Sequence, residues 1–221
     1  MRSARWSATF VALLLVVAAC GGNGSDATGA DQDGEGFSGY RRTPAPSVAE
    51  VGVPVLPHPE PVPLTAAPGH LRIVYFGYTS CPDVCPTTMS DLRRALFDMD
   101  DEDAARVDVM MITIDPDRDV PEKLDAYVTT FFDEGESVRI EDDPALAEVA
   151  EVFGARYAVT PVEGGEPEVS HSGDLYAVDD RGDIVMQWPF GITNEDLRKD
   201  LEQLLADTDA GTPTQENRST T

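Results

Sequence analysis

Positive charge is scarce in this sequence of 221 residues, where 16 lysines and arginines stand against 41 aspartates and glutamates, a net charge of −25. A surface this acidic repels phosphate backbones, so nucleic acid is excluded as an expected partner. Cysteine and histidine are also rare, with three of each. Hydrophobic residues make up 41% of the chain, which is enough for one globular domain with appendages.

The chain also lacks a long apolar run near its start. Residues 10–19 are ten apolar residues in a row, too few to span a bilayer as a helix. Arg2 and Arg5 precede them and Cys20 follows, a pattern typical of an export signal. The ending "VVAAC-GG" resembles the lipobox of bacterial lipoproteins, which predicts a signal peptide over residues 1–19 and lipidation of Cys20. Plain secretion after signal cleavage is the alternative.

Composition divides the rest of the chain into three parts. Residues 20–50 are rich in Gly, Ser, Asp and Pro, which predicts a flexible tether with a root-mean-square span of roughly 30 Å. Residues 51–206 form the predicted globular domain, and its first 20 residues are proline-studded, either an edge strand or a segment wrapped around the domain. Residues 207–221 are polar and predicted to be a disordered tail.

Apolar patterns within the domain predict alternating strands and helices. Residues 73–76 and 107–115 are apolar runs typical of strands buried on both faces. Met89, Leu92, Leu96 and Met99 recur between them at helical spacing, so the two strands should be parallel. A second helix begins at Pro121. A third has Asp143 at its cap, Pro144 at its first position and Gly154 at its end.

The C-terminal third differs in kind. Residues 174–178 and 183–188 flank "DDRG" and predict an antiparallel hairpin. Thr193 to Asp196 then give a capping-box start to a last helix. Together these elements predict an α/β fold, a thioredoxin-like sandwich with a central mixed sheet flanked by helices.

With Cys20 assigned to the anchor, Cys81 and Cys85 are the cysteines of the domain. Three residues separate them, whereas the redox motif of thioredoxin-like proteins normally has two. A disulfide between them would close a very short loop and add little stability. The pair is therefore expected to carry chemistry, either electron exchange or metal binding.

Topology predicts that His171 joins this pair. The cysteines follow the carboxyl end of a core strand, where open α/β sheets place ligands. The first strand of the hairpin should run antiparallel to the core strands, so His171, just before it, should lie at the same edge. Two thiolates and an imidazole suit copper(I), and also zinc or copper(II).

Other residues with donor atoms have simpler interpretations. His58 and His70 lie in or near the proline-rich approach and are expected to be bystanders. Asp83 should order its turn through backbone hydrogen bonds. Asp115 ends its strand at the same crevice and either supports a ligand or is an ordinary turn residue. The methionines Met89, Met110 and Met111 are expected to pack in the core.

Three segments resemble the signature segments of the Sco/SenC family of copper chaperones: "FGYTSCPDVCPTTM", "DPDRDVPEKLDAYV" and "VSHSGDLYAVDDRGDI". The resemblance covers about residues 72–205. It implies that Cys81, Cys85 and His171 bind a copper ion, and that the protein is a metallochaperone rather than an enzyme with turnover. It also implies a lipid-anchored, extracytoplasmic protein on the outer face of the cell membrane. The implied partner is the copper-bearing subunit of cytochrome c oxidase, whose copper A centre would be assembled, or another copper chaperone.

The sequence departs from the family pattern in three places. Residues 51–70 lack the usual extended hairpin, and residues 137–143 lack the usual small-residue turn. Val120 stands where a capping Thr is common, which should weaken that helix start. One alternative function stays open, because some family members act as thiol-disulfide reductants. In that case Cys81 and Cys85 are the redox pair of an extracytoplasmic thiol-disulfide oxidoreductase, and His171 only tunes the thiolates.

Overall fold

The strand β4 (Leu71–Gly77) lies at the centre of the computed structural model, which describes residues 36–53 and 62–211. All seven of its residues are buried, as a continuous apolar run requires. It pairs in parallel with β5 (Val107–Thr113) along its whole length, and antiparallel with β9 (Leu175–Val178). The predicted parallel pair is therefore confirmed.

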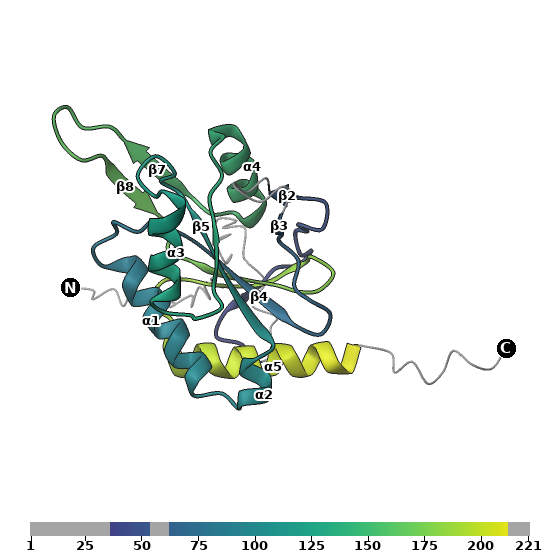
Figure 1. The fold of residues 1–221 in the computed structure, drawn as a ribbon. Helices are drawn as coiled ribbons and strands as arrows, with labels where there is room; N and C mark the ends of the chain where they lie inside the picture. Colours follow the sequence, from purple (N-terminus) through teal and green to yellow (C-terminus); the bar gives the residue numbers. More distant parts are fainter. Residues whose placement is uncertain (1–35, 54–61, 212–221) are drawn as a thin grey trace, which may run out of the picture.

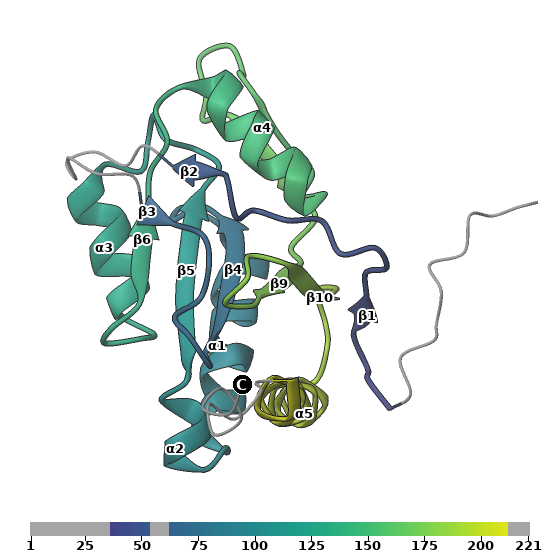
Figure 2. The same ribbon diagram turned by 90° about the vertical axis from the view of Figure 1, so that its right-hand side faces the viewer.

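Six strands form the main sheet, in the order β1-β10-β9-β4-β5-β6 (Figure 2). The hairpin of β9 and β10 (Ile184–Trp188) is antiparallel, as predicted. The short edge strands β1 (Tyr40–Arg41) and β6 (Glu136–Val138) were not predicted. The sheet is mixed, because β4, β5 and β6 are parallel and the remaining pairs are antiparallel.

Helices cover both faces of this sheet, which confirms the predicted α/β sandwich. On one face, α1 (Val84–Phe97) packs against α5 (Asn194–Gly211) and places Cys85 beside Tyr75 of β4. Phe76, the next residue of β4, points the opposite way and meets Phe153 of α4 at a ring distance of 5.3 Å. The helices are α1 (Val84–Phe97), α2 (Asp101–Ala104), α3 (Pro121–Thr129), α4 (Asp143–Phe153) and α5 (Asn194–Gly211).

Two small antiparallel ribbons stand apart from the main sheet. The strands β2 (Gly52–Val53) and β3 (Val62–Pro63) pair with each other at the start of the domain. The strands β7 (Tyr157–Thr160) and β8 (Glu168–His171) form a hairpin that projects from the body of the domain (Figure 1). This second hairpin was not predicted, and it carries His171 at its base.

Capping residues define the helix ends. The prediction that Asp143 caps α4 was wrong by one residue, because the side chain of Asp142 accepts the hydrogen bond from Ala145 N–H at 2.9 Å. Gly154 ends this helix with a φ of +74°, a left-handed conformation that favours glycine. Thr193 accepts from Asp196 N–H at 3.1 Å, as the capping box predicted. Val120 caps α3 without any side-chain hydrogen bond, as expected.

The last part of the predicted tether belongs to the folded domain. Tyr40 pairs with Gln187, Ser47 bridges Asp183, and Val48 is fully buried. A flexible tether over residues 20–50 is therefore wrong for its C-terminal portion, since edge pairing with β10 orders a segment whose composition is polar. The helix α5 likewise continues to Gly211, beyond the predicted start of the tail.

Several predictions fall outside the described residues. These are the signal peptide over residues 1–19, the lipidation of Cys20, the first part of the tether, His58 and the end of the C-terminal tail. Within residues 36–53 and 62–211, no helix combines the length and the apolar character needed to cross a membrane.

Asp200 of α5 holds the backbone of Ser38 and Gly39 against the domain. A substitution at Asp200 therefore tests how much this attachment stabilises the fold. This carboxylate is buried and accepts hydrogen bonds from Ser38 N–H, Gly39 N–H and the indole Nε1–H of Trp188, the last at 2.7 Å. We expect Asp200→Asn to lower the free energy of unfolding by about 2 kcal/mol, because an amide turned toward these donors leaves at least one unpaired. Urea denaturation followed by tryptophan fluorescence measures this, and unchanged stability would contradict the assignment.

Candidate metal centre

The first two donors lie where β4 passes into α1. After β4, a turn closed by the hydrogen bond from Cys81 N–H to Tyr78 O places Cys81 at the sheet edge. Cys85 lies in the first turn of α1, and its backbone N–H donates to Cys81 Sγ at 3.3 Å. Both cysteines are free. The five-residue "CPDVC" turn thus directs the two sulfur atoms toward each other.

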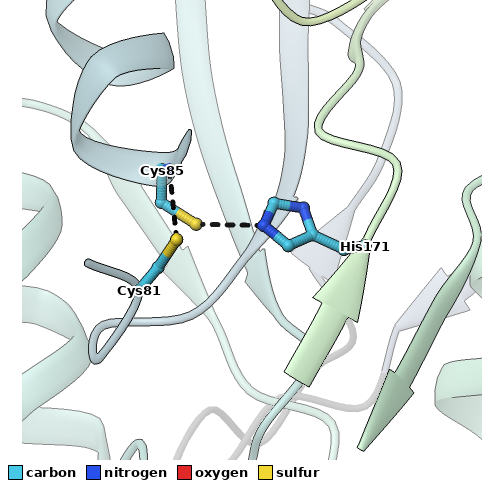
Figure 3. A group of neighbouring side chains, drawn as sticks. All are labelled: Cys81, Cys85 and His171. Carbon is cyan, nitrogen blue, oxygen red and sulfur yellow. Dashed lines mark hydrogen bonds between the residues drawn. The ribbon is translucent and has the colours of Figure 1, made fainter. Parts of the chain in front are cut away.

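The third donor arrives from the projecting hairpin. His171 is the last residue of β8, and Ser172 N–H then bonds to Arg156 O at 2.9 Å. The imidazole Nε2 lies 3.4 Å from Cys85 Sγ (Figure 3). The donor atoms of Cys81, Cys85 and His171 all lie within 4.8 Å of one another, as a group that could hold a metal ion. The predicted convergence of these three residues is therefore present.

Two tyrosines hold the imidazole ring. Tyr75 and Tyr78 meet the ring of His171 edge-on, with centroid distances of 6.1 and 5.9 Å. The other ring nitrogen, Nδ1, is buried and has no hydrogen-bond partner within the described part of the chain. Metal-binding histidines usually have such a partner. Here aromatic packing supplies the orientation instead.

Gly77 leaves room for the sulfur of Cys85. A Cβ atom at this position would lie 2.6 Å from the ring of Tyr75 and 3.1 Å from both Cys85 Sγ and the methyl group of Met111. Real Cβ atoms essentially never approach another heavy atom as closely as 2.6 Å. The end of β4 therefore requires glycine for close approach, with no need for an unusual backbone conformation.

Burial gives the three donors different protonation behaviour. Burial raises the pKa of Cys85 to about 12, so its thiol is protonated at neutral pH. Burial also lowers the pKa of His171, against the opposing influence of Asp174, so its imidazole is neutral at pH 7. Cys81 is partly exposed. Two thiols and a neutral imidazole form a soft donor set with an open side, which fits copper(I) and, less selectively, zinc or copper(II).

Among the described residues, His70 is not part of this cluster of donors, and Met89, Met110 and Met111 pack in the core. His70 precedes β4, at the end of the strand opposite the cysteines, and lies 3.7 Å from the carboxylate of Asp108. Met89, Met110 and Met111 are fully buried, which confirms their role in the core.

Asp83 and Asp115, two acidic residues near the centre, differ in burial and in their bonding partners. Asp83 was expected to order the turn through backbone hydrogen bonds. This is wrong for its side chain, which makes no cap hydrogen bond and, within residues 36–53 and 62–211, accepts only from the hydroxyl of Thr87 at 3.5 Å. Asp115 is buried and forms an ion pair with the guanidinium of Arg118, so it acts as an ordinary turn residue.

Asp119, four residues further on, is a supporting residue that no sequence pattern indicated. This side chain is completely buried and bonds to Thr79, two residues before Cys81. The "DPDRD" segment contains three aspartates, and no sequence pattern distinguishes the buried Asp115 and Asp119 from the exposed Asp117. The tyrosines Tyr75 and Tyr78 were likewise seen only as parts of a strand and its end.

Comparison with known proteins gives one consistent result. The model of the family described as SCO1/SenC matches residues 59–206, about two thirds of the chain. A protein of Stutzerimonas stutzeri named for copper binding is 30% identical over 137 residues, which cover 62% of this chain and 67% of that protein. A SCO2-like protein of Rickettsia prowazekii is 28% identical over 131 residues, covering 58% of this chain and 63% of that protein.

Solved structures agree with the sequence matches. The chain is similar to copper-bound ScoI of Bradyrhizobium japonicum, with a TM-score of 0.54 and 30% identity, covering 61% of this chain and 85% of that one. It is also similar to apo Sco1 of Thermus thermophilus, with a TM-score of 0.59 and 29% identity, covering 79% of this chain and 96% of that one. The predicted thioredoxin-like fold is thereby confirmed.

The unequal burial of the two cysteines generates a test on the reduced, metal-free protein. At pH 8 we expect iodoacetamide to alkylate Cys81 at least about a hundredfold faster than Cys85, because the thiolate is the reactive form and Cys85 is buried with a pKa of about 12. Below that pKa, the Cys85 rate should rise about tenfold per pH unit as its thiolate fraction grows.

Mass spectrometry of the variants Cys81→Ser and Cys85→Ser assigns each rate to one sulfur. The two rates should converge in denaturant, where burial no longer protects Cys85. Equal rates in the folded protein would contradict the unequal burial.

Proposed function

The chain belongs to the SCO1/SenC family, and from this premise we propose that it is a metallochaperone that carries a copper ion on Cys81, Cys85 and His171. The observation that carries the proposal is the convergence of two thiols and one imidazole within 4.8 Å, from segments 86 residues apart. The names of two relatives mention copper, the S. stutzeri protein and the B. japonicum structure, and both are about 30% identical to this chain.

The chemistry of the donors supports the binding of copper(I) as cargo. Thiolates are soft ligands that select copper(I), and a neutral imidazole adds a third donor without a charge to neutralise. Binding must displace the proton of Cys85, whose pKa burial raises to about 12. His171 is neutral at neutral pH, because burial lowers its pKa, so in the tautomer protonated at Nδ1 its Nε2 can bind without losing a proton. Copper affinity therefore depends on pH through the thiols and weakens as the pH falls.

Transfer of the cargo needs an exposed approach. Cys81 is the partly exposed sulfur, whereas Cys85 is buried. Three protein donors leave room for a ligand from a partner, which can begin the exchange on the open side. We propose that the acceptor is the copper A centre of cytochrome c oxidase, reached directly or through another copper chaperone. Family membership supports this acceptor.

We also propose that the domain works outside the cytoplasm, on a lipid anchor at Cys20. The apolar run at residues 10–19 and the "VVAAC-GG" ending support this placement. It would hold the domain at the outer face of the cell membrane, where an oxidase subunit is accessible.

A second function, thiol-disulfide exchange, is favoured by the unequal exposure of the free cysteines. The Cys81 thiolate would attack a partner disulfide to give a mixed disulfide and release one partner thiol. The Cys85 thiolate would then displace the second partner thiol and form the Cys81–Cys85 disulfide. Two electrons pass from the chain to the partner, and His171, whose Nε2 lies 3.4 Å from Cys85 Sγ, only tunes the thiolates in this scheme.

The variant His171→Ala separates the two functions. We expect its copper(I) affinity to fall at least about a hundredfold, because one of three donors is lost. Competition with a chromophoric copper(I) chelator measures this. The matched control is His70→Ala, which removes a partly buried histidine at the other end of β4 and should leave affinity unchanged.

The same two variants should be assayed for reduction of a disulfide peptide. If His171→Ala keeps both copper affinity and reductase activity, the metallochaperone proposal is wrong and thiol exchange remains. If copper affinity falls while the control is unaffected, His171 is a ligand.

The anchor is tested with Cys20→Ala in the full chain. We expect the variant to lose fatty-acid labelling and to move from the membrane fraction to the soluble fraction, since no lipid can then be attached. Cys81→Ala is the control and should stay with the membrane. If Cys20→Ala stays in the membrane fraction, the anchor proposal is wrong and the copper proposal is unaffected.

A further inference from the structure

A buried carboxylate lies behind the turn that carries Cys81. Asp119 follows β5 and is completely buried. Its Oδ2 accepts from Thr79 N–H at 2.9 Å and from the Thr113 hydroxyl at 2.7 Å. Its Oδ1 accepts from the Thr79 hydroxyl and lies 3.4 Å from the Lys123 ammonium. Both oxygen atoms therefore have two partners each.

These contacts connect two segments that are 40 residues apart. Thr79 lies between β4 and Cys81, whereas Thr113 ends β5. Thr79 offers both its backbone N–H and its hydroxyl, so two bonds fix its position and orientation. Because only Ser80 separates Thr79 from Cys81, the place of the sulfur depends on this attachment.

Lys123 adds a second attachment next to the first. Its ammonium donates to the Ser80 hydroxyl at 3.1 Å and to Arg118 O at 3.2 Å, besides its contact with Asp119. Ser80 directly precedes Cys81. The turn is thus held at two successive residues by groups from the segment 118–123.

We propose that Asp119 is a positioning residue that holds Cys81 where its sulfur meets Cys85 and His171. The proposal rests on the proposed function only for the copper readout below. Charged acceptors make hydrogen bonds about twice as strong as neutral ones, and a buried carboxylate persists only when it is fully paired. An asparagine here keeps the size of the side chain but replaces one accepting oxygen with an NH₂ donor. At least one hydrogen bond to Thr79 or Thr113 is then lost, and the turn is held less firmly.

The first experiment compares two buried aspartates in the complete protein. We expect Asp119→Asn to lower copper(I) affinity about tenfold or more, because a displacement of 1 Å can cost up to a hundredfold in a preorganised site. Asp200→Asn is the matched control, since Asp200 is equally buried and accepts from three donors, including Trp188. Its affinity should stay within about twofold of the unmodified chain, despite its lower stability. Equal losses in both variants would overturn the proposal.

A second pair of variants keeps the proposal testable if Asp119→Asn fails to fold. Thr79→Val removes the hydroxyl donor and retains shape, whereas Thr79→Ser retains the donor. We expect about a fivefold loss of copper(I) affinity for the valine variant and rescue by serine, because the hydroxyl is what bonds to Asp119. A purely steric role for Thr79 would give the reverse order and would count against the proposal.

A metal-free measurement separates this proposal from the copper proposal. Oxidised dithiothreitol accepts two electrons from Cys81 and Cys85, which leaves a protein disulfide and the dithiol reagent. We expect Asp119→Asn to lower this equilibrium constant about tenfold, because the two sulfurs lose effective concentration, and Asp200→Asn to leave it unchanged. If the unmodified chain binds no copper(I), the proposed function fails, and this equilibrium alone decides the role of Asp119. An unchanged constant in Asp119→Asn would overturn it.

Discussion

Backbone pairing along β4 brings the parts of the site together. Its parallel partner β5 ends at Thr113, so the segment that contains Asp119 begins beside the turn of Cys81. Its antiparallel partner β9 begins at Leu175, so the chain that has just left His171 returns to the same edge. A single buried strand thus sets the positions of three segments distant in sequence. The separation of 86 residues between Cys85 and His171 is bridged by sheet geometry.

The donors differ in how much water reaches them, and this difference shapes their chemistry. Cys85 is buried in the core, and burial raises the pKa of its thiol to about 12. His171 comes from a hairpin outside the main sheet and is oriented by two aromatic rings. Cys81 is partly exposed. A soft cation bound here would lie at the boundary between core and solvent. The buried Cys85 would bind it on the core side, and a partner could approach it on the side of Cys81.

The convergence of the three donors could be predicted, because this convergence depends on long apolar runs and on the order of the elements. Both give strong patterns in the sequence. The runs at residues 73–76 and 107–115 predict the central strands, and the order of the elements then fixes the edge. The short strands β1, β6, β7 and β8 were not predicted, since two to four residues of mixed polarity show no alternation of apolar and polar residues. The cap of α4 was misplaced by one residue because Asp142 and Asp143 have equal propensity for that position.

The buried polar contacts could not be predicted for a different reason. Nothing in "DPDRD" distinguishes Asp119, which is buried, from Asp117, which is exposed. That distinction arises only when Thr79 and Thr113 supply donors from elsewhere in the fold. Side-chain hydrogen bonds between distant segments are a product of the tertiary structure, and local sequence carries little trace of them.

The absence of a side chain at Gly77 limits how this site can diversify. The space that a methyl group would need is already filled by the Tyr75 ring, the Cys85 sulfur and the Met111 methyl. Any larger residue must displace the aromatic ring that orients His171 or the sulfur itself. Any side chain at this position would therefore disturb two donors at once, the Cys85 sulfur directly and the His171 imidazole through the Tyr75 ring.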